Sequence, residues 1–347
     1  MSTSAELPLI TQAQPNPTWL AQWTEEILEP ELPIVDPHHH LSDHWGGYYA
    51  DQLAADVQTG HRVQATVFVQ CGWAYRQDGP QALAPVGETE AVVAQALVLN
   101  ARDDGTRYCA GIVGYADLRL GAAVAEVLAA HVHAGQGRFR GIRCSAAQHA
   151  AFRHGVMTPP PPHLYLDPAF RQGFARLAEF GLSFESWSYH NQLGEVIDLA
   201  RAFPGTAIVI NHVGAPLGVG PYAGRRAEVR AEWLPAMRAL SECPNVCVKL
   251  GAFGMTLLGF DFHTRAQPPN STELAAAWRP YVETCIELFG AERCMFESNF
   301  PVDKGTCSYP VLWNAFKRIA EHASPAQKAA LFSSTASRFY RINPLHE

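Results

Sequence analysis

Three consecutive histidines, His38, His39 and His40, are the residues of this chain best suited to chemistry, and they closely follow the apolar pair Ile34 and Val35. In an extended strand, side chains two positions apart lie on the same face, so His38 and His40 point one way and His39 points the other. Neutral imidazole is a common ligand of divalent transition metals. One face of this segment therefore offers a pair of metal ligands, to which neighbouring strands need add only one or two donors.

The elements that must position these histidines are eight short apolar runs, largely β-branched, which alternate with longer helical patterns. The runs predict strands at residues 32–38, 63–70, 108–116, 139–144, 182–187, 207–212, 246–250 and 294–297. Helical patterns occupy residues 88–102, 122–134, 168–180, 194–203, 226–241 and 272–289. Eight such units predict an α/β fold whose parallel strands close into a (β/α)8 TIM barrel. The alternative, a doubly wound sheet, would carry a glycine-rich turn where this chain has its histidines.

The length of 347 residues suits a single barrel domain at residues 31–347, preceded by an N-terminal extension at residues 1–30. The extension is rich in proline, threonine and glutamine before a short helical pattern at residues 19–28. We expect it to pack across the bottom of the barrel or against a neighbouring subunit. A homo-oligomer of this chain would form through the same segment.

The composition excludes several classes of function. The net charge is −7 and the basic residues are scattered, which argues against a nucleic-acid partner and favours a small soluble substrate. The chain has no uninterrupted apolar stretch of about 20 residues and no export signal, so neither a membrane span nor secretion is expected. The eight cysteines lie mostly inside apolar runs and form no CxxC pair. We expect reduced thiols and a cytoplasmic location.

In a barrel of this kind the C-terminal ends of the strands meet at one mouth, where the active site lies. The expected strand ends of this chain are unusually polar, and they comprise His38, His40, Gln70, Asp117, Arg143, Glu185, Asn211, His212, Lys249, Glu297 and Asp303. A single polar strand end is more often a hydrogen-bonded structural residue than a ligand. Three converging imidazoles are harder to explain in that way, so we expect His38, His40 and His212 to share one site.

At these strand ends the chain resembles the amidohydrolase-related (amidohydrolase 2) TIM-barrel hydrolases, and within them the branch of sugar lactonases and 2-pyrone-4,6-dicarboxylate lactonase. Five motifs carry the resemblance in order: Asp36-Pro37-His38-His39-His40-Leu41, Phe139-Arg140-Gly141-Ile142-Arg143, Asn211-His212-Val213-Gly214-Ala215-Pro216, Val248-Lys249-Leu250 and Phe296-Glu297-Ser298-Asn299-Phe300-Pro301-Val302. The resemblance implies a distorted (β/α)8 barrel that hydrolyses a cyclic ester, with His38, His40 and His212 in its catalytic centre.

One position departs from the pattern of that superfamily. Most of its members have an aspartate after the eighth strand, where this chain has Asn299, which can serve neither as a general base nor as an anionic ligand. Either Glu297 or Asp303 takes that role, and we favour Asp303 as the base that deprotonates a water molecule. In the competing interpretation, Asp303 pairs with Lys304 or caps the following helix.

The resemblance also bears on the cofactor. Superfamily members with two metals bridge them by a carboxylated lysine at the end of the fourth strand, where this chain has Arg143. One divalent ion, zinc or manganese, held by His38, His40 and His212, is therefore expected. The lactonase branch also includes members that work without metal, and in that case the same histidines would bind and polarise the substrate carbonyl.

Further residues are expected to hold the substrate. Arg143 would clamp a substrate carboxylate in a bidentate contact, unless it forms a structural ion pair across the barrel. Tyr189 and His190 resemble the substrate-contacting Tyr-His segment of the family, and His190 would hydrogen-bond the leaving oxygen, unless it belongs to the start of the next helix. Asn299 completes the expected substrate-binding set.

Three functions of different class follow. The first is a hydrolase that opens a lactone or related ester of a small carboxylated metabolite. The second is a non-oxidative decarboxylase of an aromatic or muconate-like acid, because a sister branch of the family has the same barrel and histidine pair. The third is a non-catalytic metabolite-binding barrel, which Asn299 permits. Ring opening releases a proton, decarboxylation releases carbon dioxide, and the third function predicts binding without turnover.

Overall fold

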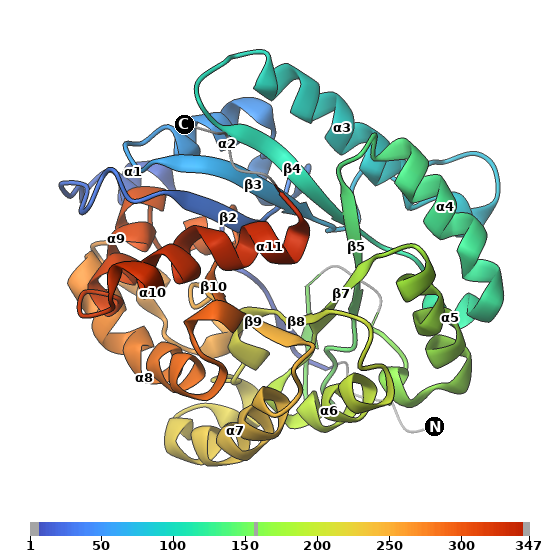
Figure 1. Cartoon of the computed structure of the whole chain (residues 1–347). Helices are drawn as coiled ribbons and strands as arrows, with labels where there is room; N and C mark the ends of the chain where they lie inside the picture. Colours follow the sequence, from blue (N-terminus) through green and yellow to red (C-terminus); the bar gives the residue numbers. More distant parts are fainter. Residues whose placement is uncertain (1–6, 156–158, 343–347) are drawn as a thin grey trace.

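The computed structural model describes residues 7–155 and 159–342, and it contains a sheet of eight parallel strands ringed by helices (Figure 1). The strands are β2 (Ile34–His39), β3 (Val63–Val69), β4 (Arg107–Gly114), β5 (Phe139–Ser145), β7 (Ser183–Trp187), β8 (Ile208–Ile210), β9 (Val246–Leu250) and β10 (Cys294–Phe296). Each lies in one of the eight predicted runs, to within two residues at either end. The prediction of a parallel (β/α)8 barrel is confirmed.

The barrel closes between its first and last strands, and this closure forms part of the functional site. The strand order runs β10-β9-β8-β7-β5-β4-β3-β2, and a bridge between His39 and Phe300 joins the two ends of the sheet. The His40 amide donates to the Phe300 carbonyl at 2.8 Å, and the Asn299 amide donates to the His38 carbonyl at 2.9 Å. The histidine motif and the Asn299 motif, far apart in sequence, therefore lie side by side.

The six predicted helices are also present. They are α3 (Val86–Asn100), α4 (Val124–Ala134), α5 (Pro168–Glu179), α6 (Leu193–Ala202), α7 (Arg226–Ser241) and α8 (Ser271–Phe289). Helix α5 begins where Asp167 accepts hydrogen bonds from the amides of Ala169 and Phe170, with Pro168 at its first position, which needs no hydrogen-bonded amide. Four further helices were not predicted, namely α2 (Ala50–Val57), α9 (Tyr309–Ile319), α10 (Pro325–Ala329) and α11 (Thr335–Tyr340).

One stretch among the described residues, Gln81–Asn100, is long and apolar enough to cross a bilayer by length and composition alone. Half of its apolar window is buried in the protein, and α3, which lies within it, packs against β4. These are the contacts of a barrel helix.

The apolar core has two layers, as a barrel requires. The larger layer fills the space between the strands and the surrounding helices. The smaller one fills the inside of the barrel, where Val35, Val67, Val113 and Met295 pack together, and Tyr340 at the end of α11 packs against them. Helix α11 crosses the end of the barrel that faces the viewer in Figure 1.

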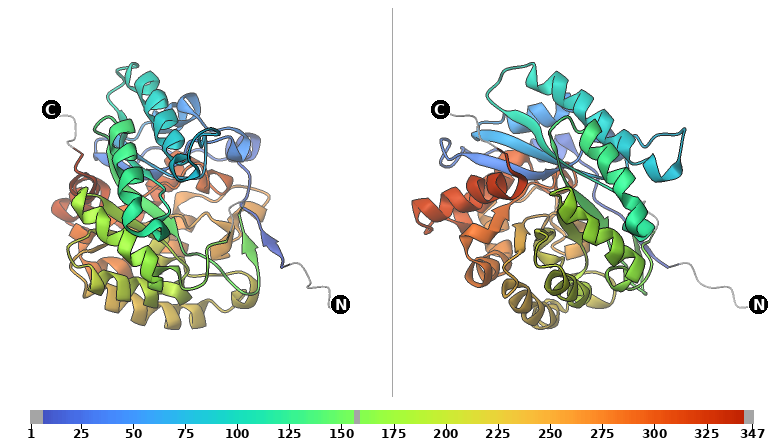
Figure 2. Two further views of the ribbon diagram at one scale, coloured as in Figure 1. Left: turned by 90° about the vertical axis from the view of Figure 1, so that its right-hand side faces the viewer. Right: turned by 45° about the vertical axis from the view of Figure 1, so that its right-hand side comes forward.

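The part of the N-terminal extension around residues 9–12 lies at the opposite end. Strand β1 (Leu9–Ile10) pairs in parallel with β6 (Arg153–His154), which belongs to the loop that follows β5. Figure 2 shows β1 beside β6, at the end of the barrel away from α11. The Thr256 hydroxyl, in the loop after β9, donates to the Thr11 carbonyl at 2.8 Å.

The prediction that the extension packs across the barrel bottom is therefore wrong. Residues 9–12 of the extension lie over the C-terminal ends of the strands, because the backbone of the loop after β5 offers an edge with which a strand can pair, whereas Leu28 and Glu29 contact Lys317 on α9. The helical pattern predicted at residues 19–28 is also shorter than expected, since α1 spans Pro17–Leu20. Whether the extension mediates an oligomer stays a prediction.

Deleting residues 1–13 should leave the barrel folded and make the loops after β5 and β9 more mobile. All eight barrel strands lie beyond residue 33, whereas the amides of Arg153 and Thr256 donate to Pro8 O at 2.8 Å and to Gln12 Oε1 at 3.1 Å. Hydrogen exchange followed by mass spectrometry should show protection at these two amides falling by about tenfold or more. Val248 and Met295 in the sheet serve as internal controls, and a loss of protection there would contradict the prediction.

Candidate functional site

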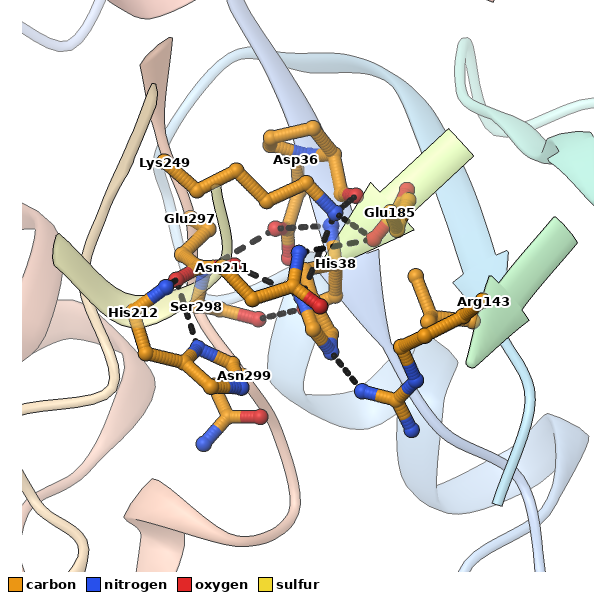
Figure 3. A network of polar contacts seen from close by, with 12 residues as sticks. Asp36, His38, Arg143, Glu185, Asn211, His212, Lys249, Glu297, Ser298 and Asn299 are labelled. Atoms are coloured by element: carbon orange, nitrogen blue, oxygen red, sulfur yellow. Dashed lines mark hydrogen bonds and ion pairs between the residues drawn. The ribbon is translucent and has the colours of Figure 1, made fainter. Parts of the chain in front are cut away.

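Six buried charged or imidazole side chains converge at or next to the C-terminal ends of six different barrel strands (Figure 3). We call this set the mouth cluster, and its members are His38, Arg143, Glu185, His212, Lys249 and Glu297. Each was among the polar strand ends seen in the sequence. Because the strands are parallel and close into a barrel, side chains from distant parts of the chain meet at this single point.

Glu297 is the residue that joins the two histidines of the mouth cluster. Its Oε1 atom accepts hydrogen bonds from His212 Nδ1 at 2.8 Å and from the His212 backbone amide at 3.2 Å. Its Oε2 atom lies 2.6 Å from His38 Nδ1, but this contact lacks hydrogen-bond geometry, and Oε2 is buried without a hydrogen-bond donor. The carboxylate therefore fixes the His212 ring and retains free lone pairs beside His38.

Lys249 is a further member of the mouth cluster, and its ammonium group is fully buried. The ammonium lies 2.8 Å from Glu185 Oε2, donates to the Pro37 carbonyl at 2.9 Å, and lies 3.2 Å from His38 Nδ1. Glu185 also accepts hydrogen bonds from Asn211 Nδ2 at 2.8 Å and from the hydroxyl of Tyr340. This ion pair is saturated with partners, as a buried pair must be to persist.

Arg143 approaches His38 from the other side. Its Nη1 atom lies 3.3 Å from His38 Nε2, and its Nη2 atom donates to the Gln70 carbonyl. The Arg143 Nε atom is buried and has no hydrogen-bond partner among the residues that the structure describes. Both ring nitrogens of His38 therefore face a cationic side chain of the protein.

Burial controls the protonation of the mouth cluster. It lowers the pKa values of His38 and His212 well below the ordinary imidazole value, and the nearby charges of Lys249 and Arg143 lower them further. It raises the pKa of Glu297 to about 8, even though Lys249 acts in the opposite sense. Burial also acts to raise the pKa of Glu185, but the charge and hydrogen bond of Lys249 outweigh it and the pKa falls. At neutral pH the imidazoles are neutral, which is the form that binds a metal or accepts a hydrogen bond.

The backbone turns His38 into the barrel by means of a bulge. Val35 faces the barrel interior, so strict alternation would also direct residues 37 and 39 inward. The register with β3 shifts between Asp36 and His39, which inserts one residue into β2. His38 therefore points into the mouth, while His39 Nε2 hydrogen-bonds Thr66 Oγ1 at 2.9 Å.

The backbone is strained at the mouth. His212, Val213 and Asn299 adopt left-handed φ angles of +57°, +48° and +54°. This region is unfavourable for residues other than glycine, most of all for a β-branched valine. The strain occurs directly after β8 and β10, where it turns His212 and Asn299 toward the cluster.

The donors of the mouth cluster fit a divalent cation. The ligating atoms of His38, His212 and Glu297 lie within 4.8 Å of one another, and all three residues are buried. Two imidazole nitrogens and a carboxylate oxygen form a donor set that both zinc and manganese accept. The buried lone pairs of Glu297 Oε2, which lack a donor, are available to such an ion.

His40, which the sequence predicted as a third ligand, is not part of this donor set. Its ring centroid lies 5.0 Å from that of His38, and its Nδ1 atom lies 2.7 Å from the Val69 carbonyl. Because a carbonyl can only accept, Nδ1 carries the proton and Nε2 keeps its lone pair. Ligation by His40 stays a prediction, and the structure brings Glu297 to His38 and His212 instead.

Asp303 and Asn299 form a buried pair. Asn299 Nδ2 donates to Asp303 Oδ1 at 2.9 Å, and the Gly254 amide donates to Asp303 Oδ2 at 2.8 Å. Burial raises the pKa of Asp303 to about 8, and these hydrogen bonds oppose that rise. Lys304 pairs with Asp56 at 2.7 Å. The predicted base therefore adjoins the site through Asn299, whose backbone amide donates to the His38 carbonyl.

The two remaining predicted residues lie farther out. Tyr189 is buried with its ring edge-on to Trp187, at a centroid distance of 5.9 Å, and Trp187 in turn packs edge-on against His212 at 4.7 Å. His190 accepts a hydrogen bond from the Leu217 amide at 3.3 Å, and its Nε2 atom lies 3.5 Å from Glu232 on α7. The structure does not bring His190 into the mouth cluster, and the substrate contacts of both residues stay predictions.

Sequence reasoning gave no role to several residues that shape the site. Asp36 accepts hydrogen bonds from the Ser298 amide at 3.0 Å and from Tyr309, which ties β2 to the segment after β10. Its place in the histidine motif was the available signal. Trp187 and Trp45, which stacks on His40 at 5.8 Å, carried no signal in the sequence because a loop aromatic is ordinarily a packing residue.

Comparison with known proteins places this geometry in a family. The amidohydrolase family model (Amidohydro_2) matches residues 35–342. The uncharacterized protein y4mH of Sinorhizobium fredii (strain NBRC 101917 / NGR234) is 32% identical over 336 residues, which cover 90% of this chain and 99% of that protein. The L-fucono-1,5-lactonase of Burkholderia ambifaria is 30% identical over 288 residues, which cover 78% of this chain and 87% of the lactonase.

Solved structures share the fold. An amidohydrolase from Burkholderia multivorans with bound zinc superposes with a TM-score of 0.66 at 23% identity, covering 89% of this chain and 99% of that one. A 5-carboxyvanillate decarboxylase from Novosphingobium aromaticivorans, complexed with manganese, gives a TM-score of 0.55 at 13% identity, covering 90% of this chain and 97% of the other. With a barrel of this kind and a family model that spans nearly its whole length, the chain belongs to the amidohydrolase family.

Proposed function

We propose that this amidohydrolase opens a lactone or related ester of a small carboxylated metabolite. The observation that carries the proposal is the buried donor set of His38, His212 and Glu297, with the Arg143 guanidinium directly beside it. Neutral imidazoles and fixed cations in a desolvated site are suited to stabilising the oxyanion that forms when water attacks an ester carbonyl. The similarity to an L-fucono-1,5-lactonase at 30% identity supports a lactone as the substrate class.

In this proposal His38, His212 and Glu297 hold one zinc or manganese ion. When bound, such an ion would polarise the carbonyl and acidify a water molecule. The chain's own residues prepare the site: burial keeps both imidazoles neutral, and the hydrogen bond from His212 Nδ1 to Glu297 fixes the orientation of that ring. His40, held by its Val69 contact, would add a hydrogen-bond acceptor at the edge of the set.

Arg143 binds the carboxylate of the substrate in this proposal. Its Nε atom is buried without a partner, although its Nη1 and Nη2 atoms contact His38 and Gln70. An unpartnered buried donor is costly, and a substrate carboxylate would satisfy it. The guanidinium would also hold the substrate close to the imidazoles, where the carbonyl must lie for attack.

We assign proton removal from the attacking water to Asp303. Glu297 serves as a metal ligand in this proposal, which leaves Asp303 for the role of the base. Its pKa of about 8, raised by burial, suits a base that works near neutral pH.

The product distinguishes this proposal from the two alternatives. Opening a lactone releases a proton without gas, whereas a decarboxylase on the same barrel releases carbon dioxide. A binding barrel would retain a ligand and turn over nothing. Assays on L-fucono-1,5-lactone and other carboxylated or sugar-derived lactones, with a pH indicator and a parallel carbon dioxide measurement, therefore decide among the three functions.

Substituting the two carboxylates should separate a base from a metal ligand. Asp303→Asn should lower kcat by about 10²–10⁴ and leave the metal content unchanged, because a general base contributes a factor of that order. Glu297→Gln should lower both the metal content and kcat, because it removes an anionic ligand. Metal content is measured by mass spectrometry and kcat by proton release.

Asp303→Asn keeps the shape of the side chain but sets its NH2 group against one of two donors, Asn299 Nδ2 or the Gly254 amide, so thermal unfolding must first confirm that the variant is folded. If this variant retained full kcat, the base would not be Asp303 and Glu297 would be the remaining carboxyl group. If Glu297→Gln kept its metal, the donor set would be wrong.

Gly251→Ala should disturb the site from outside the donor set. A methyl group at this position would lie 2.4 Å from Glu297 Cγ and 2.4 Å from the Glu297 carbonyl oxygen, so Glu297 must move. Displacing a ligand in this way should weaken metal binding by about tenfold or more. Gly194→Ala on α6 is the matched control, because nothing lies within 4 Å of its added methyl group. Equal metal affinity in the two variants, measured by calorimetry, would contradict the prediction.

A further inference from the structure

Lys249 is one of two cationic side chains that contact His38 of the proposed donor set, and Arg143 is the other. The Lys249 ammonium lies 3.2 Å from His38 Nδ1, the same ring nitrogen that Glu297 Oε2 approaches to 2.6 Å. Lys249 is fully buried, and its ion pair with Glu185 and its hydrogen bond to Pro37 O hold it in place. These partners place the positive charge of Lys249 beside His38.

The position of Lys249 affects whether the ring nitrogens of His38 are free to bind a metal ion. A neutral imidazole offers one lone pair and carries one proton. Arg143 Nη1 lies 3.3 Å from Nε2 and Lys249 Nζ lies 3.2 Å from Nδ1, so a protein donor contacts each nitrogen. A metal ion that binds His38 must therefore replace one of these two donors.

The charges of the surrounding side chains also oppose the binding of a metal ion. The acidic side chains of the network in Figure 3 are Asp36, Glu185 and Glu297, and its basic side chains are Arg143 and Lys249. With three acidic and two basic side chains, this network is already close to charge balance without an added ion. A divalent cation would make it positive, and like charges repel strongly in a buried, weakly screened site.

We propose that Lys249 sets the affinity of this site for divalent cations by competing with the metal ion at His38, which makes the bound metal exchangeable. The inference rests on the proposed donor set of His38, His212 and Glu297 and concerns a residue outside it. Lys249 acts through its charge and its donor at His38 Nδ1, and it is a positioning residue.

Titration calorimetry with ZnCl2 and with MnCl2 on metal-stripped protein tests the proposal. Lys249→Met and Lys249→Gln should each bind metal at least tenfold more tightly than the unmodified chain. Glutamine retains a donor toward Glu185 and so guards against a folding defect of the methionine variant. Thermal unfolding confirms that each variant is folded before titration.

Lys317→Met is the matched control. Lys317 is also buried, its ammonium lies 2.9 Å from His61 Nδ1, and it donates to the carbonyls of Leu28 and Glu29. It thus repeats the environment of Lys249, with an imidazole and backbone carbonyls, outside the donor set. Its substitution should leave the metal affinity unchanged.

The outcomes are distinct. Tighter binding in both Lys249 variants with no change in Lys317→Met supports the proposal, and so does metal binding that appears only when Lys249 is replaced. Unchanged or weaker binding in a folded Lys249 variant overturns the proposal and leaves the donor set standing. If no protein binds metal, the proposed metal site itself fails, and the inference fails with it.

Discussion

The structure of the mouth depends on one constraint, the burial of ionisable side chains where the parallel strands end. A buried charge is stable only with a counter-charge and hydrogen bonds around it. Glu185 meets this requirement through Lys249, Asn211 and Tyr340. These partners come from strand β9, from the residue after β8, and from helix α11 at the far end of the barrel. The hydrogen bonds that stabilise this ion pair therefore connect the mouth of the barrel to helix α11 at its other end.

Most of the fold could be predicted from the sequence because buried parallel strands are apolar on both faces. Short β-branched runs such as that around Val209 stand out against longer helical patterns. Helix α2 was not predicted, because its eight residues include an exposed Asp51 and Gln52 and a buried Asp56 paired with Lys304. The course of the N-terminal extension depends on a long-range strand pairing with residues 153–154, which local sequence does not encode.

The site was predicted as a set of residues more readily than as a geometry. Parallel topology alone brings the strand ends together, so His38 and His212 were expected to meet. Which third donor joins them depends on a bulge in β2 and on left-handed backbone at His212, and neither follows from alternation. The same bulge explains why His39 faces Thr66 on the outer side. The sequence could therefore predict that these residues lie close together, but the direction of each side chain depends on backbone angles that only the structure shows.

The departure at position 299 has a physical explanation in the structure. Asn299 Nδ2 donates to Asp303 Oδ1 at 2.9 Å, in a place where both residues are buried. An aspartate at 299 would set a second carboxyl oxygen against Asp303 without a donor between them, and two buried carboxylates at that distance cannot both ionise. The amide thus supplies the donor that a buried carboxyl group at 303 requires. In this chain the side chains at 299 and 303 therefore form one hydrogen-bonded unit.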